Sequence, residues 1–314
     1  MKIVASIYAY NFHLIVSYLN DGIRIIPFKD NRSKFFNSKA EYSFDIPNIY
    51  ALTELQAKSH ILYGTSEQKL TSFNLATESK FSFQTINEHQ IPITDVSQLS
   101  INYKQNNLFA LSENKGIFQI DISNSHNPKI DKKIIPEAFE KLGQPVVSNI
   151  ESTDNNLFIA IRNFGVTNIV IDKQIHKERK ELRSEDPQDV KRLSYHNIIV
   201  VADSQDGLIL YDFDNSKLIK KIQLPNSDFP QQIETTSAAI IIKGISGLYA
   251  YYLTNNRLIT LREGKIGALT LYYDYIFFTS KGKLFSMTIN DSFDKHGFTY
   301  DKDRIELEII RRKN

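Results

Sequence analysis

Short apolar runs recur along the chain in pairs, and a polar segment that usually ends in glycine separates the members of each pair. Three of the pairs read LIVSYLNDGIRII from Leu14, LFALSENKGIFQI from Leu108 and IVVADSQDGLILY from Ile199. The runs are rich in Ile, Val, Phe and Tyr, which favour β-strands. Dipeptides such as Asp-Gly favour tight turns, because glycine adopts a positive φ without a steric penalty. Each pair is therefore predicted to form a β-hairpin.

The hairpins repeat at a regular interval over the whole chain. Seven turn positions are separated by 35 to 49 residues, and an aliphatic residue follows the turn in six of the seven copies. The positions are Gly22, Lys69, Gly116, Gly165, Gly207, Gly247 and Gly282. Such a regular period is typical of repeat architectures, in which neighbouring units cover one another's apolar faces.

Two further strand-like segments flank the hairpin in most units. The preceding segment is apolar, as in KIVASIYAY from Lys2, and the following one is more polar, as in PKIDKKII from Pro128. Four strands in about 43 residues is the size of one β-propeller blade. The sequence thus predicts an all-β fold, a single seven-bladed β-propeller domain over residues 1–314 with four antiparallel strands per blade. The predicted blades are approximately 2–44, 45–88, 89–135, 144–186, 187–228, 229–263 and 264–312.

Three segments interrupt or extend the repeat. Pro136–Gly143 predicts a two-turn helix, with proline in the first turn and glycine just past the end. The mixed-charge segment Ile175–Asp189 predicts either an outer strand with an exposed loop or a short surface helix. Asp291–Lys302 predicts a polar loop, and Arg304–Ile310 the outer strand of the last blade.

The third strand and the turn after it resemble a known repeat in three units. GIFQIDISNSHNPKI from Gly116 resembles the LVIVD repeat of bacterial and archaeal β-propellers, with Asp121 at the end of the strand. GLILYDFDNSKLIKKI from Gly207 places Asp212 there, and GVTNIVIDK from Gly165 has Asp172 one residue later. The period also resembles that of WD40 propellers, although the chain contains no Trp. The resemblance implies a binding or scaffold role, and these aspartates are predicted to cap turns.

Composition removes several classes of function. The chain has 38 basic and 36 acidic residues and a net charge of +2, which disfavours a protein that coats nucleic acid. The absence of cysteine excludes disulfides, thiolate metal sites and cysteine nucleophiles. The seven histidines lack metal-binding spacing, so no metal and no cofactor are expected. No apolar run approaches the length of a membrane span, so we expect a cytoplasmic protein without membrane insertion.

The leading functional prediction is a non-enzymatic scaffold that binds one or more protein partners. It rests on the predicted fold and on the lack of a catalytic motif. The expected surface carries the turns between second and third strands, and Phe164 is the aromatic residue at such a turn. The predicted contact residues are Asn20, Asp21, Glu67, Gln68, Asn114, Lys115, Phe164, Gln205, Asp206 and Lys281.

The alternative is a propeller enzyme or small-ligand binder with its site at the mouth of the central channel. The first strand of each blade lines that channel, and the first strands of blades 4 to 6 carry ionisable residues. Acid and base groups that converge there could transfer protons. The candidates are Glu151, Lys191, Arg192 and Glu234.

Overall fold

The computed structural model describes most of the chain and divides it into two compact units. The first unit comprises residues 1–49 and 233–314, and the second comprises residues 50–232. The described residues are 4–10, 13–18, 22–27, 42–44, 51–55, 61–66, 69–76, 82–90, 93, 96–102, 106–112, 115–124, 127–136, 139, 143, 145–153, 155–171, 176–193, 196–272, 275–289, 293–294, 297–298 and 305–307.

Four antiparallel sheets of four strands make up the second unit. The first two consist of β5 (Ala51–Leu55), β6 (Ile61–Ser66), β7 (Lys69–Ala76) and β8 (Ser82–Gln90), then β9 (Val96–Asn102), β10 (Asn107–Ser112), β11 (Gly116–Asp121) and β12 (Lys129–Ile134). The next two consist of β13 (Val147–Ser152), β14 (Asn156–Ile161), β15 (Gly165–Ile171) and β16 (His176–Leu182), then β17 (Pro187–Leu193), β18 (Ile198–Asp203), β19 (Gly207–Asp212) and β20 (Leu218–Ile222).

Three further four-stranded sheets belong to the first unit, except for residues 230–232 at the start of one first strand, which belong to the second unit. One consists of β1 (Val4–Tyr10), β2 (His13–Tyr18), β3 (Gly22–Pro27) and β4 (Tyr42–Phe44). The others consist of β21 (Pro230–Thr235), β22 (Ala239–Gly244), β23 (Gly247–Tyr252) and β24 (Arg257–Glu263), and of β25 (Leu269–Tyr272), β26 (Tyr275–Ser280), β27 (Lys283–Thr288) and β30 (Ile305–Leu307). The short hairpin β28 (Phe293–Asp294) and β29 (Gly297–Phe298) lies before β30.

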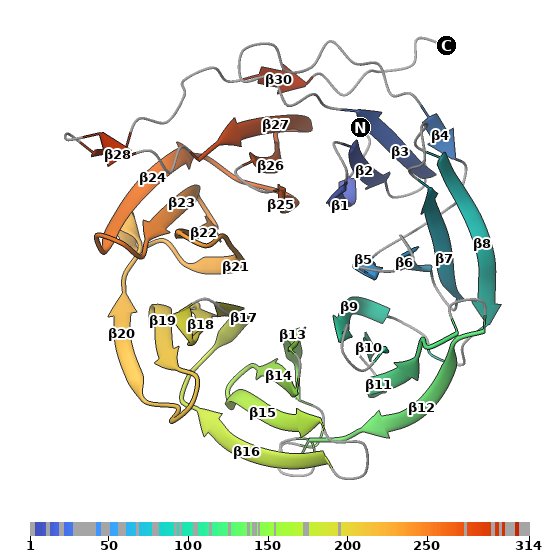
Figure 1. Cartoon of the computed structure of the whole chain (residues 1–314). Coiled ribbons are helices and arrows are strands. Elements are labelled where there is room, and N and C mark those ends of the chain that lie inside the picture. The colour runs from blue at the N-terminus through green and yellow to red at the C-terminus, as the bar shows by residue number, and fades with distance from the viewer. Residues whose placement is uncertain are drawn as a thin grey trace. The chain divides into compact units, whose positions relative to one another are not determined.

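The prediction of an all-β, propeller-like fold is confirmed. Strand order follows the sequence in each four-stranded sheet, so the first strand forms one edge and the fourth strand the other. In the second unit, β9 contacts β5 and β13, and β13 contacts β17, so first strands neighbour first strands. Figure 1 shows these four strands on the inner side of that unit and β8, β12, β16 and β20 on its outer side. That the seven sheets form one domain stays a prediction.

The core lies between neighbouring sheets rather than within any one of them. All six residues of β14 are buried, because both faces of its sheet are covered. Leu157, Ile159 and Ile161 pack against the sheet that contains Phe109 and Leu111. On the opposite face, Phe158 and Ala160 join a cluster that also includes Val190, Ile199, Val201 and Ile209. The continuous apolar runs of the sequence are thus central strands with two covered faces.

The structure resolves or corrects several local predictions. The segment after Ile175 forms strand β16, which removes the helical alternative, and the expected polar loop at 291–302 contains the β28–β29 hairpin. The predicted last outer strand is confirmed as β30, which pairs with β27. The helix expected from Pro136 lies mostly outside the described residues, although the Phe139 amide donates to the Pro136 carbonyl at 2.9 Å. Strands β5 and β24 had no separate sequence prediction.

Two turn glycines lie so close to an outer strand that a side chain would not fit. Gly207 has a φ of 80°, and a Cβ there would lie 2.4 Å from the Ile222 carbonyl oxygen. Gly165 has a φ of 125°, and its Cβ would lie 2.7 Å from the Leu182 carbonyl oxygen. The recurrent glycine therefore lets the hairpin turn approach the fourth strand of the same sheet.

We expect Gly207→Ala to lower the free energy of unfolding by about 2 kcal/mol or more, since it combines left-handed backbone strain with a backbone clash. Urea denaturation measures the change. Gly264→Ala is the matched control, because Gly264 also has a positive φ, of 99°, but nothing lies within 4 Å of its Cβ position. Equal losses in the two variants would show that the close approach contributes nothing.

Candidate functional site

The structure describes half of the predicted turn surface. Asn20, Asp21, Glu67, Gln68 and Asn114 lie outside the described residues. Lys115, Gln205 and Lys281 are exposed, as expected for residues at turn tips. Asp206 forms an ion pair with Lys221 of β20, with Oδ2 2.5 Å from Nζ, so its carboxylate holds its own sheet together.

Phe164 does not stand exposed on that surface. Its side chain is half-buried and packs against the apolar cluster between the sheets of β10 and β14. The aromatic character of this turn residue is thus explained by packing within the chain.

The aspartates singled out by the LVIVD resemblance cap turns, as predicted. Asp121 Oδ1 accepts a hydrogen bond from the Ser123 amide at 2.8 Å. Asp212 Oδ1 accepts from the amides of Asp214 and Asn215, both at 3.0 Å. Asp172 lies outside the described residues.

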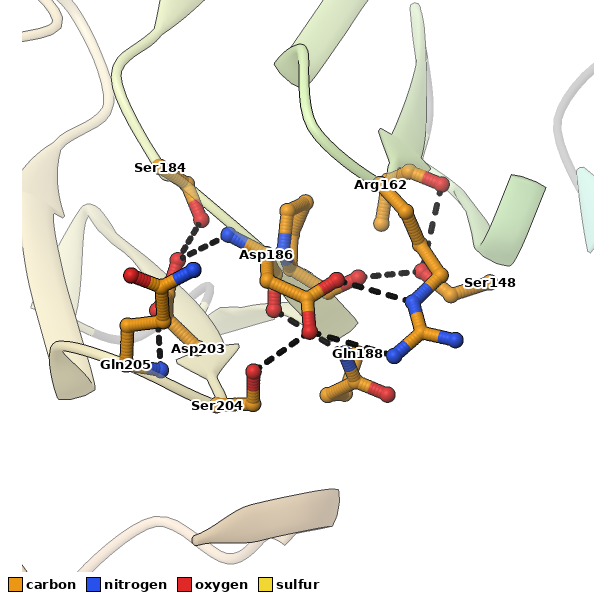
Figure 2. A network of polar contacts seen from close by, with 10 residues as sticks. Ser148, Arg162, Ser184, Asp186, Gln188, Asp203, Ser204 and Gln205 are labelled. Carbon is orange, nitrogen blue, oxygen red and sulfur yellow. Dashed lines mark hydrogen bonds and ion pairs between the residues drawn. The ribbon is translucent and has the colours of Figure 1, made fainter. Parts of the chain in front are cut away.

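A polar network centred on Asp186 joins two neighbouring sheets of the second unit (Figure 2). Asp186 lies between β16 and β17, and Arg162 reaches it from the turn between β14 and β15. Arg162 Nε lies 2.8 Å from Oδ1 and Nη2 lies 3.1 Å from Oδ2, which makes a two-pronged ion pair. Ser204, in the turn between β18 and β19, donates to Asp186 Oδ2 at 2.5 Å.

Asp203, the last residue of β18, forms the other half of the network. Its Oδ1 accepts from the amides of Gln205 at 2.7 Å and Asp206 at 2.8 Å. Its Oδ2 accepts from the Ser184 hydroxyl and from the Asp186 amide, the latter at 3.0 Å. Figure 2 shows that this bond from the Asp186 amide joins the two halves of the network. We call this set the inter-sheet clasp: Arg162, Ser184, Asp186, Asp203 and Ser204.

Hydrogen bonding keeps both carboxylates of the clasp ionised. The hydrogen bond and charge of Arg162 lower the pKa of Asp186 against the opposing effect of burial, and the Ser204 hydroxyl lowers it further. Burial raises the pKa of Asp203, but the hydrogen bonds from Ser184 and three backbone amides outweigh it, so the net shift is downward. All four carboxylate oxygens therefore accept protein donors, and the clasp is a structural device.

Sequence analysis did not identify the clasp. Its members come from three separate connections, so no spacing motif marks them. The one available signal is Asp203 itself, which stands four residues before its turn glycine, where none of the other six repeats has an acid.

Side chains of β9 hold the free edge of β13 on the inner side of the second unit. The Gln98 amide donates through Nε2 to the Ser148 carbonyl at 2.7 Å and accepts through Oε1 from the Ile150 amide at 3.0 Å. Ser100 Oγ accepts from the Ser152 amide at 2.7 Å. One glutamine thereby does for β13 what a peptide group of a paired strand would do. The position of β13 relative to β9 follows from these bonds.

Glu151 and Lys191 form an ion pair between the first strands β13 and β17. Glu151 Oε2 lies 3.0 Å from Lys191 Nζ, and the side chains are 22% and 24% exposed. The two residues occupy equivalent places, since Glu151 pairs with Phe158 and Lys191 with Val200, each seven residues before a turn glycine. Among the described residues, Glu151 Oε1 has no hydrogen-bond partner, and it is open to solvent. A half-buried carboxylate with one open oxygen can accept a proton from a bound molecule.

The other two predicted channel residues are not part of this pair. The guanidinium of Arg192 lies over the Phe213 ring, with Cζ 3.8 Å from the centroid. Glu234 belongs to β21, in a sheet of the first unit. Of the four candidates, the structure therefore brings Glu151 and Lys191 into direct contact. No cluster of metal-ligating side chains exists among the residues that the structure describes.

We expect Asp203→Asn to lower the free energy of unfolding at pH 7 by about 2 kcal/mol, because the new amide group would face the donors that Asp203 now accepts. The wild-type carboxylates have lowered folded-state pKa values, so their contribution is present above about pH 4 and is lost as the pH falls through those values. Urea denaturation from pH 7 to pH 2.5 should therefore show a shallower acid loss in the variant.

Asp206→Asn is the control, since it breaks one half-exposed ion pair worth less than about 1 kcal/mol. An Asp203→Asn protein with wild-type stability at pH 7 would contradict a structural role for the clasp.

Comparison with known proteins establishes the fold but no family. No protein-family model matches the sequence, and no curated protein matches it. The LVIVD and WD40 resemblances are thus supported only as far as the propeller-like fold. In the part of the chain that the structure describes, no helix is long and apolar enough to cross a membrane.

Solved structures similar to this chain include a candidate 6-phosphogluconolactonase from Bacteroides fragilis. That likeness covers 98% of this chain and 95% of the other, with 13% identity and a TM-score of 0.67. The computationally designed Ika8 protein is also similar, over 91% of this chain and 84% of its own, with 12% identity and a TM-score of 0.58. The prediction of a non-enzymatic scaffold was wrong, because it inferred a lack of catalysis from a fold that this chain shares with a candidate enzyme. The comparison favours the enzyme alternative over the scaffold.

Proposed function

We propose that this protein is an enzyme that hydrolyses a small lactone or ester at the Glu151–Lys191 pair. The observation that carries the proposal is the 3.0 Å contact between a half-buried carboxylate and an ammonium group on neighbouring first strands. The similarity in fold to a candidate 6-phosphogluconolactonase supports the choice of reaction, because that name denotes hydrolysis of a sugar lactone. Lactone hydrolysis needs a base for water and positive charge near the carbonyl oxygen.

Glu151 supplies the base in this proposal. Its open oxygen Oε1 accepts a proton from water, and the resulting hydroxide adds to the lactone carbonyl carbon. The carbonyl π electrons move to the oxygen, which becomes an oxyanion. When the tetrahedral intermediate collapses, the ring C–O bond breaks, and the protonated Glu151 returns its proton to the departing ring oxygen. The base is thereby restored, and the product is a hydroxy acid.

Lys191 has one role that follows from its place beside Glu151. Its charge stabilises the oxyanion as it develops, and partial burial strengthens that effect because fewer water molecules screen the charge. This role requires the two first strands to stay in register.

The proposal predicts that the purified full-length protein hydrolyses at least one member of a lactone and ester panel above the spontaneous rate. A suitable panel contains D-glucono-δ-lactone, 6-phosphogluconolactone, γ-butyrolactone and 4-nitrophenyl acetate. Glu151→Gln should lower kcat/KM by about 100-fold or more, since the amide cannot accept the proton. Lys191→Met should lower kcat/KM by a similar factor, mainly through kcat. Proton release in a lightly buffered indicator assay measures the lactone rates.

Glu185→Gln and Lys217→Met are matched controls, because both side chains are exposed and lie outside the pair. Each should keep wild-type kcat/KM. The proposal is wrong if the wild-type protein hydrolyses no member of the panel, or if Glu151→Gln retains full activity.

A further inference from the structure

We propose that Arg192, held over the ring of Phe213, anchors the oxyanion group of a small ligand, either a carboxylate or a phosphoryl group. The inference deepens the proposed function by naming a substrate class, namely lactones or esters that carry a negative charge. The inference rests on the proposed function only for the reaction that follows binding. Anion binding by Arg192 can be tested without that reaction.

Aromatic packing fixes the orientation of the Arg192 guanidinium. Its Cζ lies 3.8 Å from the centroid of the Phe213 ring. Phe213 in turn meets Phe158 edge-to-face, with centroids 6.1 Å apart and planes at 64°. Stacking uses the face of the guanidinium and leaves the N–H groups at its edge available for a planar or tetrahedral anion. The anchor is thus oriented before any ligand arrives.

Arg192 has no counter-ion among the described residues. Within the part of the chain that the structure describes, no ion pair or hydrogen bond involves its side chain, and its Nε is buried without an acceptor. Leaving a buried charged donor unpaired costs stability, because it has lost water and gained nothing in return. Arg162 shows the contrast within the same unit, since Asp186 occupies both prongs of its guanidinium. The unmet hydrogen-bonding capacity of Arg192 therefore points to an acceptor that comes from outside the chain.

The anchor and the proposed base border the same gap between β13 and β17. Glu151 pairs directly with Phe158, so both side chains leave the same face of their sheet. Phe158 is also the ring that contacts Phe213 beneath Arg192. On β17, Arg192 pairs with Ile199, which packs in one cluster with Phe158. A ligand held by Arg192 would consequently lie on the Glu151 side of β17.

Charge at this place favours an anion over a neutral molecule. Glu151 is already paired with Lys191 at 3.0 Å, and it makes no ion pair with Arg192. With one guanidinium as the anchor, a single carboxylate or phosphoryl group is the matching ligand chemistry. A polyanion would need further cations.

Equilibrium binding to the full-length protein tests the anchor without any turnover. Isothermal titration calorimetry with inorganic phosphate, D-gluconate and D-glucose distinguishes a phosphoryl group, a carboxylate and a neutral sugar. We expect saturable binding of phosphate or gluconate and none of glucose. Arg192→Gln should weaken the binding of that anion about tenfold or more, since a charge-assisted hydrogen bond is lost. Arg183→Gln, a change of the same charge at an exposed arginine, should leave it unchanged.

Two further variants separate a binding role from a structural one. Arg192→Lys keeps the charge but loses the planar stack, so it should retain the fold and still bind the anion several-fold more weakly. Glu151→Gln should bind the anion more tightly, because a nearby negative charge is removed, and it should lose hydrolysis. Because anion affinity and hydrolysis are measured separately, the binding role of Arg192 can be confirmed even if no hydrolysis is found. Absence of saturable anion binding, or equal affinity in wild type, Arg192→Gln and Arg192→Lys, would overturn the inference.

Discussion

The covering of each sheet by its neighbours is the constraint on which the rest of the structure depends. The hairpin strands are apolar on both faces, as β14 shows with all six residues buried. A single sheet of this kind cannot fold alone in water, because about 25 cal/mol is lost for each Å² of apolar surface left exposed. The clusters on either side of β14 therefore bind adjacent sheets into one body within the second unit. The Glu151–Lys191 pair lies on edge strands, and the inter-sheet clasp lies in the turns and connections and at the end of β18.

Much of this arrangement follows from local chemistry and could be predicted. Alternation of apolar runs with Asp-Gly or Lys-Gly turns indicates hairpins, and the recurrence of the turn glycine at Gly116, Gly165 and Gly207, 49 and 42 residues apart, indicates equivalent repeats. Because the repeats are equivalent, the first strand of each could be predicted to line the inner side. Glu151 and Lys191 were identified as candidates on that basis. The weakness lay in edge strands. β24 has the sequence RLITLRE with one buried residue in seven, and β5 has the mixed sequence ALTEL, so neither shows the continuous apolar run of the hairpin strands.

The side-chain network between neighbouring sheets of the second unit was beyond prediction for a physical reason. Arg162, Asp186 and Asp203 meet because three connections fold against one another, and the conformation of each depends on the other two. Arg192 illustrates the same limit. Its place next to Lys191 did not show that the two side chains take different partners, Glu151 for Lys191 and the Phe213 ring for Arg192. A candidate site could be defined only from the structure, which shows the face of the sheet that each side chain occupies.

Gln98 has a consequence for how first strands are spaced. Within a sheet, backbone pairing sets neighbouring strands about 4.8 Å apart whatever the side chains. Between β9 and β13, a side-chain amide takes the place of one peptide partner, so the separation depends on the length of that side chain. The distance between β9 and β13 is therefore set by the side chain at position 98 rather than by backbone pairing. Homologous propellers could widen or narrow this gap through single substitutions while every sheet kept its own geometry.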